Sequence, residues 1–144
     1  MLNLMKKYQN AFSVSGFETE LAEIIKNDLA PVCDEINVDA MGNVIALKKG
    51  KDPSKKLMIA AHMDEIGFFV SYIEDSGLVR ITPVGGFNYI AAAYSGVTFE
   101  NGVRGVIIPD GEDPNKTDKY FVDIGTTSRK QTEKKLSLGE FGTL

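Results

Sequence analysis

LMIAAHMDEIGFFV, residues 57–70, contains two apolar runs separated by a histidine and two carboxylates. The first run, residues 57–61, shows no alternation of apolar and polar side chains. A strand that is apolar on both faces is typical of a central strand covered on both sides. The run therefore predicts an α/β layer rather than a half-exposed hairpin.

The segments before this stretch supply a helix and two strands. Residues 18–30 carry apolar positions at helical spacing, with charged residues between them, and Pro31 ends the pattern because proline cannot donate the next backbone hydrogen bond. Residues 35–38 and 43–47 read as strands joined at Met41 and Gly42. One amphipathic helix beside short strands fits the same α/β layer.

The pattern changes near residues 65–67. Short apolar runs at 68–73, 78–84, 97–99, 103–108 and 120–124 alternate with glycine-containing turns, and no long helical pattern separates them. Such spacing predicts a small β-barrel or sandwich. A short helix is expected over 128–136, and the polar, Pro- and Gly-containing segment 109–119 is expected to be a surface loop.

His62 and Asp64 are the residues with the clearest chemical potential. Imidazole is a good ligand for zinc or cobalt, and a ligating histidine is generally oriented by a carboxylate or carbonyl. On an extended chain, Asp64 points to the same side as His62. The pair predicts one metal ligand and one orienting carboxylate, although a single histidine beside an apolar strand is also compatible with a purely structural role.

Composition excludes several classes of function. The net charge is −4 and the isoelectric point is about 5.0, so the chain lacks the basic excess that nucleic-acid binding needs. No apolar run approaches a membrane span, and no secretion signal is present, so a cytoplasmic location is expected. Cys33 is the single cysteine, which excludes an intrachain disulfide and a cysteine-based zinc site; it is expected to face the core.

Several segments together resemble one family. SGFETE (15–20), DEINVDAMGNVIALKKG (34–50), AHMDEIGF (61–68), ITPVGGF (81–87), GVRGVI (102–107) and YFVDIGTTSRK (120–130) are similar, in order and spacing, to the tetrahedral and glutamyl aminopeptidases. These are cocatalytic metallopeptidases, sometimes labelled endoglucanase or cellulase-like. The resemblance implies an α/β fold in which residues 1–65 are the N-terminal part of a catalytic domain. Residues 66–144 would be a small β-barrel insert domain used in subunit association.

The resemblance also implies the chemistry. His62 would bind one of two divalent metal ions, zinc or cobalt, and Asp64 would be the catalytic residue that orients and polarises this histidine. The reaction would remove N-terminal residues from peptides by means of a metal-bound hydroxide. A homo-oligomer or a complementing C-terminal half is the expected partner.

The remaining family ligands have no match here. The family's further carboxylates, second histidine and glutamate general base follow the barrel, whereas the tail after residue 125 offers Glu133 and Glu140 but no histidine. A zinc site needs three or four protein ligands. We therefore expect this chain to be a truncated or split N-terminal part that binds at most one metal ion weakly and is inactive alone.

Two other functions stay open at this point. A non-enzymatic assembly module would use the barrel for oligomerisation, with the catalytic remnant unused. Glycan hydrolysis would need two carboxylates at a defined separation, which sequence cannot place.

Overall fold

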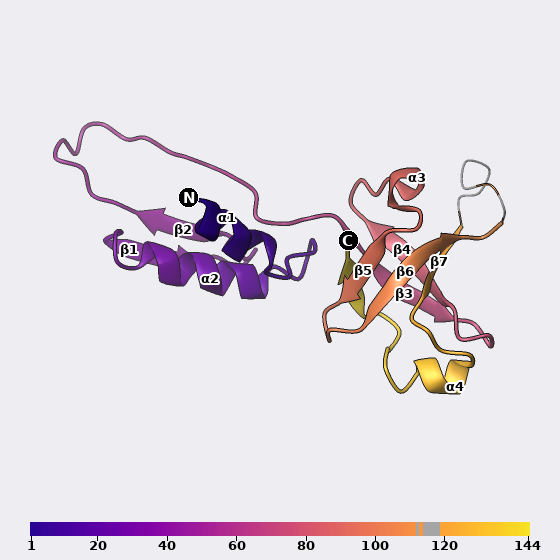
Figure 1. Ribbon diagram of the computed structural model, residues 1–144. Coiled ribbons are helices and arrows are strands. Elements are labelled where there is room, and N and C mark those ends of the chain that lie inside the picture. The colour runs from indigo at the N-terminus through magenta and orange to yellow at the C-terminus, as the bar shows by residue number, and fades with distance from the viewer. Residues whose placement is uncertain (112, 114–118) are drawn as a thin grey trace. The chain divides into compact units, whose positions relative to one another are not determined.

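The chain divides into two compact units, Met1–Asp64 and Glu65–Leu144. The computed structural model describes residues 1–111, 113 and 119–144, so most of the surface loop expected over 109–119 lies outside the described residues. Figure 1 draws the first unit in indigo to magenta and the second in magenta to yellow.

The first unit is a small α/β layer. Helix α1 (Leu2–Gln9) precedes helix α2 (Thr19–Leu29), and strands β1 (Glu35–Val38) and β2 (Val44–Leu47) form an antiparallel hairpin that contacts α2 (Figure 1). Helix α2 buries Leu21 and Ala22, as its apolar spacing predicts. At the hairpin turn Gly42 has a φ of 85°, a conformation that glycine adopts without a steric penalty.

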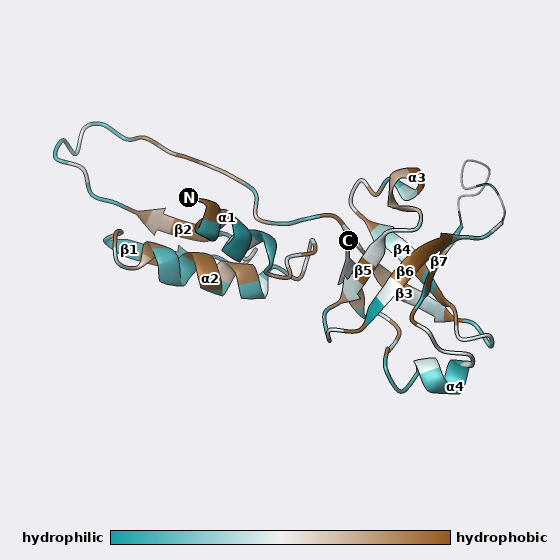
Figure 2. Ribbon diagram, viewed as in Figure 1, coloured by the Kyte–Doolittle hydropathy of each residue, from teal (hydrophilic) through white to brown (hydrophobic). Residues whose placement is uncertain are grey.

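The prediction of a central strand at residues 57–61 is wrong. These residues belong to no strand, and Leu57, Met58 and Ile59 are 87–89% exposed. Figure 2 shows this hydrophobic stretch in brown on the segment between β2 and the barrel. An apolar run forms a strand only when another strand supplies backbone partners, and no described segment pairs with this one.

The second unit is a closed antiparallel barrel. Its strands follow one another around the barrel in the order β3-β4-β7-β6-β5-β8, and β8 pairs with β3 to close it. The strands are β3 (Gly67–Ile73), β4 (Val79–Val84), β5 (Gly96–Phe99), β6 (Arg104–Pro109), β7 (Tyr120–Asp123) and β8 (Phe141–Thr143). The predicted fold class, a partial α/β layer followed by a small barrel, is confirmed.

The barrel encloses the main core. Its fully buried side chains include Phe68, Phe99 and Ile107, and the Phe68 and Phe99 rings meet edge to face at 5.5 Å. Figure 2 shows the strands β6 and β7 largely in brown and helix α4 (Arg129–Thr132) largely in teal.

Three elements were not expected from the sequence: α1, the four-residue helix α3 (Tyr89–Ala92) and β8. The helix expected over 128–136 is confined to α4. Cys33 is half-buried rather than placed in the core. Among the helices of the described residues, none combines the length and apolar character needed to cross a membrane.

Candidate metal centre

His62 lies on the extended segment that follows the exposed apolar run. It belongs to neither a helix nor a strand, and its side chain is 85% exposed. An imidazole in this position is accessible to a metal ion. Its orientation depends on the side chains that it contacts.

Asp64 provides those contacts. The Nδ1 atom of His62 lies 3.0 Å from the backbone oxygen of Asp64 and 3.2 Å from its Oδ1 atom. Both oxygens are acceptors when the carboxyl is ionised, so we assign the imidazole proton to Nδ1, and the lone pair of the neutral ring then lies on Nε2. His62 and Asp64, which were expected on the same side of the chain, are therefore in contact.

Ser15 is a third member that the sequence analysis missed. Its hydroxyl donates to Oδ2 of Asp64 at 2.6 Å, across 49 residues of sequence. The Ser15 hydroxyl, and after it the His62 imidazole, holds the pKa of the Asp64 carboxyl below its ordinary value. The only signal for Ser15 was its place in the segment SGFETE, which identifies no partner.

The described residues supply one side chain, His62, that is suited to bind a metal ion. His62 has the geometry of a metal-binding histidine whose second nitrogen is held by an outer carboxylate. Within residues 1–111, 113 and 119–144, no group of three or more His, Cys, Asp or Glu side chains could hold an ion. A complete zinc site uses three or four protein ligands, so the assignment of His62 as a metal ligand stays a prediction.

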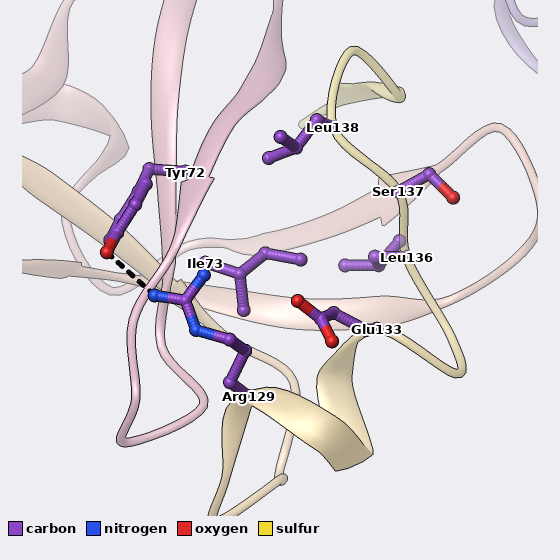
Figure 3. Close-up of a pocket in the computed structure, with 7 residues that line it drawn as sticks. All are labelled: Tyr72, Ile73, Arg129, Glu133, Leu136, Ser137 and Leu138. Atoms are coloured by element: carbon purple, nitrogen blue, oxygen red, sulfur yellow. Dashed lines mark hydrogen bonds between the residues drawn. The ribbon is translucent and has the colours of Figure 1, made fainter.

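A pocket of about 260 Å³ in the barrel unit contains neither His62 nor Asp64. Figure 3 shows its lining, made by Tyr72, Ile73, Arg129, Glu133, Leu136, Ser137 and Leu138. Arg129 donates to the hydroxyl of Tyr72 at 2.7 Å and to Asp75 at 3.0 Å, so its guanidinium already holds neighbouring side chains. The other tail glutamate, Glu140, accepts from the backbone of Ser137.

Comparison with known proteins agrees with the fold. The family model for the M42 glutamyl aminopeptidases matches residues 42–144. A protein of Acetivibrio thermocellus whose name marks it as a candidate aminopeptidase is 42% identical over 144 residues, covering 97% of this chain and 43% of its own length.

Two solved structures match nearly all of the chain. An aminopeptidase from the archaeon Desulfurococcus kamchatkensis is 32% identical with a TM-score of 0.89, over 99% of this chain and 42% of its own. The TET1 peptidase of Pyrococcus horikoshii, which can assemble into a tetrahedron or a large octahedral shell, is 27% identical with a TM-score of 0.79, over 99% of this chain and 46% of its own.

The α/β layer and the closed barrel are the fold that this chain shares with these two peptidases. The chain belongs to the M42 glutamyl aminopeptidase family. It spans less than half the length of these relatives.

Proposed function

We propose that this chain supplies His62 and Asp64 to an aminopeptidase site. Once further polypeptide supplies the remaining metal ligands, this site removes N-terminal residues from peptides. The observation that carries the proposal is the pair of contacts from Asp64 to Nδ1 of His62, at 3.0 and 3.2 Å. Because Nδ1 faces Asp64, Nε2 is the ring nitrogen that can bind a metal ion. The pair lies within the residues that the family model matches.

The residues have separate roles in this proposal. Bound divalent ions, zinc or cobalt, supply the Lewis acidity that peptide hydrolysis needs. Nε2 of His62 binds one ion, and the Asp64 carboxylate holds the opposite ring nitrogen and stabilises positive charge on the ring. By ligand number, the 144 residues alone are expected to hold at most one ion weakly and to be inactive.

Exposed apolar surface on the first unit supports completion by further polypeptide. Leu57, Met58 and Ile59 are almost fully exposed, and Ile45 and Leu47 of β2 are about half exposed. A run of three large apolar side chains left exposed in this way is typical of an interaction site. We propose that its occupant is the remainder of the catalytic domain, which the relatives carry beyond the matched region.

Reconstitution tests the proposal. The chain would be combined with the polypeptide corresponding to the unmatched part of a relative, and cleavage of an aminoacyl chromogenic substrate would be measured with added zinc or cobalt. We expect activity only for the metal-loaded pair, a loss of at least about 100-fold for His62→Ala, and a loss of about 10–100-fold for Asp64→Ala.

Asp52→Ala is the matched control, because Asp52 is an exposed carboxylate whose partners, Ser54 and Lys55, lie in its own loop. It should retain full activity. A correctly assembled, metal-loaded pair that cleaves no aminoacyl substrate would contradict the catalytic proposal.

Association through the barrel is a second proposed role, and it does not exclude the first. The matched TET1 peptidase forms large shells, and its match extends over the barrel. We propose that this chain also contributes to a homo-oligomer in the complete protein, to be measured by light scattering. Glycan hydrolysis is not proposed, because the barrel pocket is lined by one carboxylate, Glu133, whereas that reaction uses two.

A further inference from the structure

Ser15 lies on a loop that is held firmly on both sides. Ser13 and Val14, directly before it, are 4% and 0% exposed. Directly after it, Gly16 turns the chain with a φ of 89°, and its backbone N–H donates to Oε1 of Glu18 at 2.7 Å. The Ser15 hydroxyl is therefore presented from a backbone that is fixed by burial and by a local turn.

The two oxygens of Asp64 are used by two different donors. Oδ2 accepts from the Ser15 hydroxyl at 2.6 Å, and Oδ1 faces Nδ1 of His62 at 3.2 Å, beside the backbone oxygen of Asp64, which lies 3.0 Å from the same Nδ1 atom. The terminal torsion of an aspartate is broad, so a carboxylate held at one oxygen only can rotate. The short bond to Ser15 restricts that rotation and keeps Oδ1 directed at the imidazole.

We infer that Ser15 is a positioning residue for His62: through Asp64 it holds the imidazole in the Nδ1–H form and so keeps Nε2 free for a metal ion. The consequence for metal binding rests on the proposed function. The positioning itself does not, because it concerns the tautomer and orientation of a histidine in the metal-free chain.

A simpler role for Ser15 is to fasten the segment around residue 64 to the loop before α2. That role predicts a loss of stability when the hydroxyl is removed, but no change in the ring nitrogens of His62. The tautomer of His62 therefore distinguishes the positioning role of Ser15 from a purely structural one. His62 is the single histidine, so its ring nitrogens give one unambiguous pair of ¹⁵N signals.

The experiment compares the ¹⁵N signals of the His62 ring in the metal-free chain with those in the Ser15→Ala and Ser15→Cys variants, at a pH where imidazole is neutral. In the unaltered chain we expect one protonated nitrogen, Nδ1, and one unprotonated nitrogen, Nε2, with well-separated signals. In Ser15→Ala the two signals should move toward each other as the Nε2–H form becomes populated. Cysteine is a weaker donor of similar size and should cause a smaller shift in the same direction.

Ser54→Ala is the matched control, because Ser54 makes a serine-to-aspartate hydrogen bond of similar length, 2.7 Å to Asp52, away from His62. It should leave the ring signals unchanged. If Ser15→Ala does not fold, the ring signals of the unaltered chain are compared with those of Ser15→Cys alone. Ring signals identical to those of the unaltered chain in a folded Ser15 variant would overturn the inference. No metal or peptide is involved, so the result is separate from success or failure of the reconstituted enzyme.

Discussion

At the residue scale, Asp39 organises the turn between β1 and β2. Its carboxylate accepts from the backbone N–H groups of Met41 and Asn43, both at 2.9 Å, and from the side-chain amide of Asn43 at 2.8 Å. The Asn43 side chain, followed by the two backbone donors, lowers the pKa of Asp39. The ionised carboxylate is thus the form that the folded hairpin prefers.

This preference makes the hairpin sensitive to acid. A lowered folded-state pKa means that the stabilisation is fully present above the unfolded-state value, roughly pH 4, and is lost as the pH falls through the lower folded-state value. We expect Asn43→Ala to raise the pKa of Asp39 toward its ordinary value without fully restoring it, because two backbone donors remain. A ¹³C carboxyl titration by NMR measures this shift.

Asp52 is the internal reference for that titration. Its pKa is also lowered, by the Ser54 side chain first, but within a different loop. The Asp52 carboxyl should titrate identically in the unaltered chain and in Asn43→Ala. An unchanged Asp39 titration in Asn43→Ala would show that the side-chain amide is not the main cause.

At the element scale, the closure of the barrel depends on a close approach between β8 and its neighbours. Gly142 of β8 pairs with Phe68 of β3 and with Phe99 of β5. A Cβ atom at Gly142 would lie 2.6 Å from the Phe68 ring and 3.2 Å from the Phe99 ring. Both rings are buried and cannot move aside without repacking the core.

We therefore expect Gly142→Ala to destabilise the barrel by about 1–3 kcal/mol, the usual cost of overpacking a well-filled core. Thermal unfolding followed by circular dichroism should show a Tm lower by roughly 4–24 °C, since about 1 kcal/mol corresponds to about 4–8 °C in a domain of this size.

Gly96→Ala in β5 is the matched control. A Cβ atom at Gly96 would meet no heavy atom within 4 Å, and the φ of Gly96 is not positive, so the change in stability should stay within about 0.5 kcal/mol. Equal effects of the two substitutions would argue against steric crowding at Gly142.

At the scale of the whole molecule, the two units have very different cores. The buried cluster around Phe68, Phe99 and Ile107 belongs entirely to Glu65–Leu144. In Met1–Asp64 the buried apolar residues are Ala11, Val14, Leu21 and Ala22. A small core with much exposed apolar surface gives little hydrophobic stabilisation.

We expect the barrel, residues 65–144, to resist urea better than residues 1–64, because the large buried cluster lies in the barrel. Residue-resolved urea unfolding of the intact chain, followed by the amide signals in NMR spectra, measures the two midpoints. Isolated residues 65–144 are the control and should unfold cooperatively as an independent barrel. A midpoint for residues 1–64 equal to or above that of the barrel would contradict the expectation.

Local patterns in the sequence determined most elements and the choice of site residues. Apolar spacing predicted helix α2, and short apolar runs between glycine-containing turns predicted the strands β3 to β7, because both signals are local in the sequence. The spacing of His62 and Asp64 likewise predicted that they would meet. Each of these features depends on residues close to one another in the chain.

Tertiary structure decided the features that depend on distant partners. Residues 57–61 look like a central strand but have no strand beside them among the described residues, and β8 was not recognised because its three residues pair across the barrel with β3 and β5. Ser15 reaches Asp64 from 49 residues away. Hydrogen-bond partners far apart in the chain leave no periodic signal, so only the folded arrangement of the backbone shows which residues they join.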